Sequence, residues 1–236
     1  MKITDFFKPD MIKLIHAIEK GKEAKAGDMI KQGLSLNIHT NKKMSPLFWL
    51  LIQQNKDAMR LAIKLGADPD FPKPNGDSLV TMLAGRNQDE FLLILLEGGA
   101  DASAVDSEGY PAMLGAVEEG RIEQIEMLIR FGGDINLTNP TGDNSALYGS
   151  YINRYEIVHY LIEQGVDYNA VNIVSTSIAW NIHEKLSNNE LNPEGSAYDW
   201  VLKIKQQLID RGVKFPPRSP LDIDADLDKQ YQNIIS

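Results

Sequence analysis

Apolar side chains recur along the chain in pairs, and a glycine follows each pair at a constant distance. The glycines lie 33 residues apart, at Gly33, Gly66, Gly99, Gly132 and Gly165. The apolar pairs ahead of them are Met29 and Ile30, Ala62 and Ile63, Leu95 and Leu96, Leu128 and Ile129, and Leu161 and Ile162. Glycine is typical of the C′ position of a helix, where the backbone takes a positive φ. The pattern therefore predicts a helix that ends near each glycine, once per unit.

Polar turn-forming residues recur with the same period. Four positions after each glycine stand Asn37, Asp70, Ser103, Asn136 and Asn169. We expect these residues to start the next turn through bonds between their side chains and the nearby backbone. A second ladder runs through Ser45, Ser78, Pro111, Asn144 and Ser177, and Gly76, Gly109 and Gly142 lie two residues ahead of it. These glycines mark a hairpin loop between units, and a fixed period of this length indicates a stacked array.

The spacing divides the chain into units at 7–39, 40–72, 73–105, 106–138 and 139–171, and a sixth unit at 172–218. Ser177 and Gly212 of the sixth unit lie 35 positions apart, where the corresponding residues of the other units lie 21 apart, so 14 residues are inserted. We place the insertion near 187–195, ahead of an amphipathic helix at 196–211. The first and sixth units depart from the pattern, as caps of an array do. The repeat domain thus spans 1–218, and we expect Pro216, Pro217 and Pro220 to stop any helix before an acidic tail at 219–236.

Composition removes several classes of function. The chain has no cysteine, which excludes disulfides, zinc fingers and thiolate nucleophiles. Its net charge of -9 argues against binding to nucleic acid or to an anionic membrane surface. No apolar run approaches the roughly 20 residues of a membrane span. Residues 1–10 lack an apolar export segment, so we expect a cytoplasmic protein as written, or a periplasmic one if a signal has been removed.

Candidate chemistry is scarce. The four histidines, His16, His39, His159 and His183, have no metal-ligand spacing. In the tail, Asp222, Asp224, Asp226 and Asp228 alternate as in a calcium loop, but Leu227 stands in place of the required glycine and Asn233 in place of the glutamate. A solvated acidic tail is the favoured interpretation. We expect no enzyme, no catalytic residues, no metal and no cofactor, with an unrecognised site in the loop 188–194 as the open enzymatic alternative.

Charge is distributed unevenly. Residues 1–72 carry 12 Lys and Arg against 8 Asp and Glu, net +4. Residues 73–171 carry 5 against 16, net -11, and residues 172–236 carry 7 against 9, net -2. One interpretation is a solvated acidic surface that aids solubility. The other is a middle stretch that steers a basic patch of a partner onto the array.

Two short motifs carry a family resemblance. The segment SPLFWLL from Ser45 and the segment GADPD from Gly66 resemble the ankyrin repeat, and the likeness extends over about residues 7 to 215. It implies an all-α solenoid of about six units, each with two short antiparallel helices joined to the next by a hairpin loop. It also implies a protein-binding module.

A narrower likeness is to bacterial ankyrin proteins whose units read like TPLFWAL and GADPN. Such proteins are often encoded beside secreted antibacterial toxins, including phospholipase effectors of contact-dependent systems such as type VI secretion. They act as immunity proteins. The resemblance implies that this chain binds and blocks a cognate toxin with a basic or mixed surface; the alternative is a general scaffold or a host-directed effector.

The ankyrin pattern also indicates which side chains face a partner. Trp and Tyr are enriched at interface hot spots, although packing between repeats is the alternative role here. We expect Phe48 and Trp180 mostly in the core. The predicted partner-binding residues are Trp49, Gln53, Met82, Arg86, Tyr110, Glu118, Glu119, Asp143, Tyr148 and Tyr151.

Overall fold

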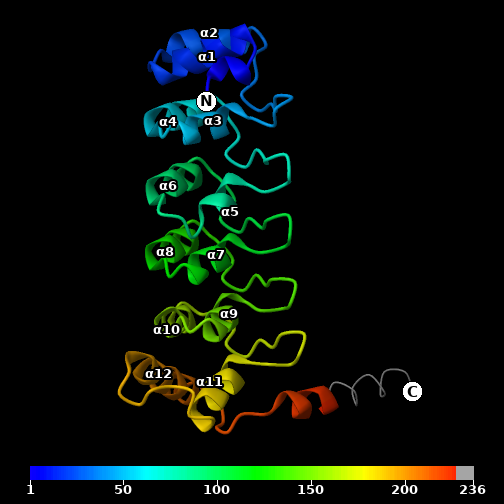
Figure 1. Ribbon diagram of the computed structural model, residues 1–236, viewed down its shortest axis with the longest axis vertical. Helices are drawn as coiled ribbons and strands as arrows, with labels where there is room; N and C mark the ends of the chain where they lie inside the picture. The colour runs from blue at the N-terminus through cyan, green and yellow to red at the C-terminus, as the bar shows by residue number, and fades with distance from the viewer. Residues whose placement is uncertain (227–236) are drawn as a thin grey trace, which may run out of the picture.

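The computed structural model describes residues 1–226, and these form an elongated stack of helical units (Figure 1). Each unit is a pair of helices, and the loops that join successive units project from one side of the stack (Figure 1). A short 3-10 helix, η1 (Ile3–Asp5), precedes the array. The helix pairs are α1 (Pro9–Glu19) and α2 (Glu23–Lys31), α3 (Pro46–Ile52) and α4 (Lys56–Lys64), α5 (Leu79–Leu83) and α6 (Asp89–Glu97), α7 (Ala112–Glu118) and α8 (Ile122–Arg130), α9 (Ser145–Tyr151) and α10 (Tyr155–Glu163), and α11 (Ile178–Ser187) and α12 (Ser196–Asp210).

Local sequence signals begin and end these helices, and the predicted helix ends near the glycines are confirmed. The glycine after each second helix has a φ between 86° and 102°, a conformation that residues with a Cβ rarely adopt. Four members of the second ladder are N-caps, whose side chains accept a hydrogen bond from the backbone N–H three residues later. These caps are Ser45 (3.2 Å to Phe48 N), Ser78 (3.1 Å to Thr81 N), Asn144 (3.0 Å to Leu147 N) and Ser177 (3.2 Å to Trp180 N).

The turn residues after the glycines act between units, which differs from the sequence prediction. Asn37 Oδ1 accepts from Asp68 N at 2.8 Å, and Asn136 Oδ1 accepts from Asp167 N at 2.7 Å. The local turn is instead held by the aspartate two positions earlier, as in the 2.9 Å bond from Asp70 N to Asp68 Oδ1. Stacking brings each turn beside the next one, so a side chain that could cap its own turn satisfies its neighbour's backbone.

One core runs the length of the stack. The second helices pack on their neighbours, as α4 does on α6 and α6 on α8, and the first helices do the same from α5 to α11. Leu14 in the first unit, Leu92 in the third and Leu208 in the sixth are all fully buried. Units of this size bury their apolar side chains only by stacking.

The third unit is irregular. Helix α5 ends at Leu83, because Ala84 takes an extended ψ of 131° and Gly85 a φ of 82°. A Cβ on Gly85 would lie 2.6 Å from the carbonyl oxygen of Gly115, so the backbones of the third and fourth units approach closely at this point.

The fully buried Gln124 of α8 forms hydrogen bonds with the backbone that follows the early end of α5. Its Oε1 accepts from Gly85 N at 2.7 Å, and its Nε2 donates to Arg86 O at 2.6 Å and to Asp89 Oδ1 at 2.7 Å. Arg121 Nη2 donates to both Asp89 carboxylate oxygens at 3.0 Å.

The extra residues of the sixth unit are spread over both helices and the loop between them. Compared with the second unit, α11 is longer by three residues, the loop at 188–195 by five and α12 by six. The predicted insertion at 187–195 thus covers only the loop and the end of α11. The longer α12 packs on α10 and closes the core.

The segment after the array is partly helical. Residues 220–226 form a helical turn that begins at Pro220, a residue expected to stop helices. Proline is tolerated there because the first N–H groups of a helix need no intrahelical partner. The Ser175 hydroxyl donates to Asp224, which ties this turn to the last hairpin. Leu227, Asp228 and Asn233, used above to judge a calcium loop, lie outside the described residues.

Candidate functional site

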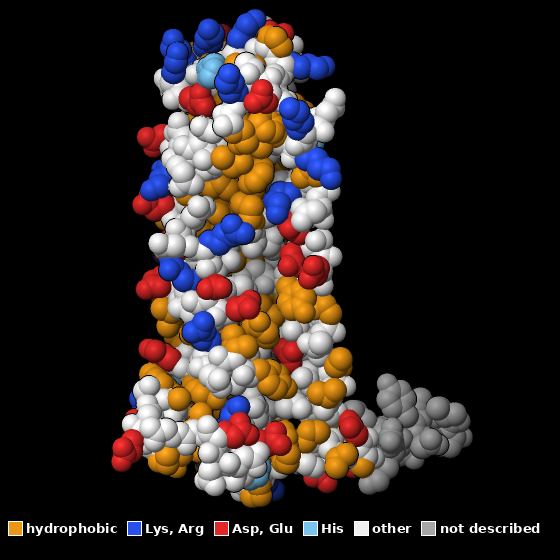
Figure 2. Space-filling view, viewed as in Figure 1, with side chains coloured by type: hydrophobic (Ala, Val, Ile, Leu, Met, Phe, Trp, Pro, Cys, Tyr) orange, Lys and Arg blue, Asp and Glu red, His pale blue; other side chains and the backbone are white. Residues whose placement is uncertain are grey.

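The first helices and the hairpin loops beside them form one continuous side of the array, here called the hairpin face. It comprises α3, α5, α7, α9, α11 and the loops that precede them. Of the predicted partner-binding residues, six are exposed: Gln53, Arg86, Tyr110, Glu118, Glu119 and Tyr151. Met82 and Tyr148 are half-buried, and Trp49 and Asp143 are buried. Figure 2 shows Lys and Arg gathered at the N-terminal end of the molecule, in agreement with the charge distribution in the sequence.

The predicted exposure of Trp49 is wrong. Its side chain is only 4% exposed, and its ring lies 5.9 Å from that of Phe6 and 6.0 Å from that of Phe7. Both phenylalanines come from the segment that follows η1, at the start of the array. Phe48, expected in the core, is half-buried instead, as is Trp180. Trp49 is therefore part of the N-terminal cap and is removed from the candidate surface.

The predicted exposure of Asp143 is also wrong, because this residue links two hairpins. It is 6% exposed, and its carboxylate accepts from Thr141 Oγ1 at 2.6 Å and from Asn172 Nδ2 at 2.9 Å. Asp77 has the same role two units earlier, where it accepts from Ser107 N at 3.0 Å. The pKa of Asp77 lies well below its usual range. The main cause is this hydrogen bond from Ser107 N, and bonds from the side chains of Asn75, Lys73 and Ser107 lower it further. The two aspartates position the hairpins and leave little capacity for a partner.

Three predicted residues meet in one cleft of about 350 Å³ on the hairpin face. Tyr110 comes from a hairpin, Glu118 from the end of α7 and Tyr148 from α9. The hydroxyl of Tyr148 has a raised pKa, first because of burial and then because of the negative charge of Glu118. Aromatic walls beside a carboxylate provide apolar contact area and a negative charge in the same small space.

Tyr151 extends the aromatic surface toward the last hairpin. Its side chain is 38% exposed, and its hydroxyl accepts a 2.9 Å hydrogen bond from Asn172 Nδ2. Burial is the largest cause of its raised pKa. Tyr110, Tyr148 and Tyr151 thus follow one another along the hairpin face of the fourth and fifth units.

Two exposed apolar residues at the tip of the last hairpin were missed in the sequence analysis. Ile173 is 72% exposed and Val174 is 60% exposed. The corresponding positions one unit earlier are Pro140 and Thr141, and two units earlier Ser107 and Glu108. Aligning the hairpins on the 33-residue period would have revealed the change to β-branched apolar side chains.

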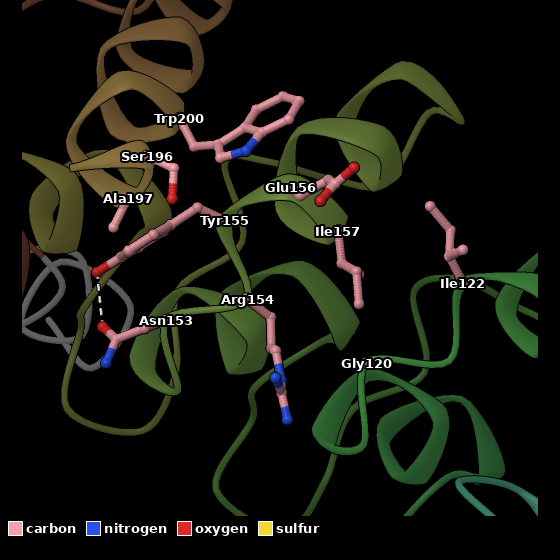
Figure 3. A pocket seen from close by; sticks show the side chains of 10 residues that line it. All are labelled: Gly120, Ile122, Asn153, Arg154, Tyr155, Glu156, Ile157, Ser196, Ala197 and Trp200. Atoms are coloured by element: carbon pink, nitrogen blue, oxygen red, sulfur yellow. Dashed lines mark hydrogen bonds between the residues drawn. The ribbon is translucent and has the colours of Figure 1, made fainter. Parts of the chain in front are cut away.

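Another pocket, of about 340 Å³, is lined by the first residues of α8, α10 and α12 and by the loops that precede α8 and α10 (Figure 3). Tyr155 donates to Asn153 Oδ1 at 2.6 Å. Arg154 points away from Trp200 and toward Gly120, and its Nε donates to Glu118 O at 2.9 Å. Because these polar groups bond to the array itself, the pocket is explained by packing between units.

The described residues, 1–226, contain no candidate metal site and no candidate membrane-spanning helix. Within this range, no three His, Cys, Asp or Glu side chains are placed to hold a metal ion. In the same part of the chain, no helix has the length and apolar character needed to cross a membrane.

Comparison with known proteins decides the kind of repeat. Residues 81–172 match the family described as ankyrin repeats in three copies. The fold is an ankyrin-repeat solenoid. An ankyrin repeat domain from Acinetobacter baumannii AYE superposes with a TM-score of 0.66 at 19% identity, over 86% of this chain and 98% of that one. Another ankyrin repeat protein has a TM-score of 0.61 at 17% identity, over 83% and 96% of the two chains.

Curated relatives share only part of their length with this chain. Protein PhlB of Serratia liquefaciens is 29% identical over 115 residues, which are 48% of this chain and 51% of PhlB. The B-cell lymphoma 3 protein homolog of Mus musculus is 25% identical over 140 residues, 57% of this chain and 31% of that protein. The chain thus spans about half or less of the length of these relatives. The ankyrin repeats of this chain indicate a protein-protein interaction module.

Proposed function

We propose that this ankyrin array is an immunity protein that binds one cognate secreted toxin through its hairpin face and blocks it. The observation that carries the proposal is the run of tyrosines on that face, with Tyr110 and Tyr151 each 38% exposed. Exposed aromatic side chains next to carboxylates are suited to a protein partner with a basic or mixed surface. The resemblance of SPLFWLL and GADPD to bacterial immunity proteins supports the choice of a toxin as that partner.

The second candidate is a scaffold or host-directed effector. Similarity to the mouse B-cell lymphoma 3 protein homolog, and 29% identity over 80 residues to a putative ankyrin repeat protein of fowlpox virus, favour it. A scaffold would bind several partners, or a host protein, without protecting a cell from a toxin.

The test combines capture of a partner with rescue of growth. The wild-type chain should retain one protein from a lysate of the source cells, and co-expression should restore growth of cells poisoned by that protein. The double variant Tyr110→Ala with Tyr151→Ala should lose both effects, because truncating two hot-spot tyrosines removes about 2–4 kcal/mol of binding free energy.

The matched control is Tyr160→Ala, a half-buried tyrosine on the outer helix α10, which should retain binding and rescue. Unchanged capture by the double variant would show that the hairpin face is not the binding surface. A captured protein that is not toxic would reject the immunity role and favour the scaffold.

A further inference from the structure

The cleft on the hairpin face has walls of unlike chemistry. Tyr110 of the hairpin and Tyr148 of α9 line it, together with Ala112, Leu114 and Gly115 of α7, which provide apolar lining. Its volume of about 350 Å³ is at the lower end of the range for small-ligand sites, about 300–1,000 Å³. It is therefore large enough for one side chain of a partner but too small for a helix.

Negative charge is concentrated among the residues that line this cleft. Its ten lining residues include Asp106, Glu108 and Glu118, and none of them is Lys, Arg or His. Within residues 1–226, neither Glu108 nor Glu118 takes part in an ion pair. Asp106 is committed to its own hairpin, since its Oδ1 accepts from Glu108 N and Tyr110 N at 2.9 Å each. Glu108 and Glu118 are thus the carboxylates without an ion-pair partner. Glu118 already accepts a hydrogen bond from the Tyr148 hydroxyl, and a carboxylate has further acceptor positions for an incoming cation.

We propose that this cleft binds the side chain of one arginine presented by the partner protein, an inference that rests on the proposed binding function of the hairpin face. The guanidinium group is planar, stacks on aromatic rings and forms two parallel hydrogen bonds with a carboxylate. Tyr110 and Tyr148 offer the rings, and Glu118 offers the carboxylate. The net charge of -11 over residues 73–171 attracts such a group from a distance.

The two tyrosines and the glutamate have separable roles. The rings provide stacking area, whereas the Tyr148 hydroxyl donates a hydrogen bond to the Glu118 side chain. Glu118 provides the charge, and its replacement by glutamine retains the size and one acceptor oxygen of the side chain. Substitutions can therefore remove the charge or the ring independently.

The test is an NMR titration of the full chain with the capped peptide acetyl-Gly-Arg-Gly-amide. Amide shifts should be confined to the cleft, with the Gly115 amide among them, and should saturate at millimolar peptide. The peptide with citrulline in place of arginine has the same shape without the charge and should produce no saturable shift. Shifts of equal size with citrulline, or shifts spread over all acidic residues, would overturn the proposal.

Variants assign the contacts. Glu118→Gln should raise the dissociation constant about tenfold, because a hydrogen bond to a charged group contributes about 1.5 kcal/mol or more. Glu126→Gln, which removes an exposed charge from the outer helix α8, should leave it unchanged. Tyr148→Phe should retain most of the binding, and Tyr148→Leu should lose it while the spectrum remains that of a folded chain. Equal affinity for the corresponding lysine peptide would reject guanidinium recognition.

Failure of this inference is distinguishable from failure of the proposed function. If the array captures and neutralises a toxin while the arginine peptide does not bind, the hairpin face is the binding surface but the cleft does not bind arginine. If the peptide binds and no toxin is found, the immunity role is wrong, but the proposal that the cleft binds arginine is confirmed.

Discussion

Asp70 shows how a single side chain joins two units at some cost in charge repulsion. Its two carboxylate oxygens accept from Asp101 N at 3.0 and 3.1 Å. Burial is the largest cause of its raised pKa, and the negative charges of Asp68 and Asp101 raise it further. The first and fourth units form the same bond with a neutral side chain, that of Asn37 or Asn136. The bond therefore needs an acceptor oxygen and not a negative charge.

We expect Asp70→Asn to raise the free energy of unfolding at pH 7 by about 0.5 kcal/mol, a small gain because solvent screens part of the repulsion. Since the folded pKa of Asp70 is raised, wild type regains stability as the pH falls through that pKa. The advantage of the variant is thus complete above the folded pKa and disappears below the unfolded value of about 3.9. Urea unfolding at several pH values measures this. The control Glu126→Gln also removes one negative charge, and an equal gain there would contradict the local explanation.

At the scale of the element, the early end of α5 is tolerated because Gln124 of the fourth unit hydrogen-bonds to the backbone groups of Gly85 and Arg86. Gln124 occupies the position that holds Phe91 one unit earlier and Ile157 one unit later. A buried polar residue at an apolar position normally destabilises a protein, but here it satisfies an N–H and a carbonyl that the interrupted helix leaves open. The irregular turn and Gln124 are therefore two parts of one feature.

Gln124→Leu should lower the free energy of unfolding by roughly 2–4 kcal/mol, because the Gly85 N–H and the Arg86 carbonyl would lose their hydrogen-bond partner. Gln207→Leu is the matched control. Gln207 is also buried, but it makes one bond, to His159 O at 3.1 Å, and its Oε1 has no partner among the described residues. Replacement of Gln207 should lower the free energy of unfolding by less than about 1 kcal/mol. Equal losses in denaturant unfolding would show that Gln124 does not repair the break in α5.

At the scale of the whole molecule, the extensive contacts between helices lie within one unit or between neighbours. The stability of such an array is a sum of unit and interface contributions, so damage at one end need not reach the other. The charge distribution follows the same axis, with a basic N-terminal end and acidic middle units. A partner that contacts the middle of the hairpin face would therefore meet the most acidic part of the chain.

Leu208→Ala and Leu14→Ala form a matched pair at the two ends, since both leucines are fully buried. Each should destabilise its own end by about 2–5 kcal/mol. Hydrogen exchange followed by mass spectrometry should show faster exchange in α10, α11 and α12 for Leu208→Ala, with α1 to α4 unchanged, and the reverse for Leu14→Ala. Uniform loss of protection in either variant would indicate that the array unfolds as one unit.

The sequence by itself determined the repeat, its period and the glycines with positive φ, because each depends on the backbone geometry of a few consecutive residues. It also predicted the tyrosines that reach the hairpin face. Only the tertiary structure decided that Phe6 and Phe7 bury Trp49, that Asn172 engages Asp143 and that Gln124 completes α5. These contacts join residues some 29 to 43 positions apart, and their partners are chosen by stacking, which a periodic pattern does not encode.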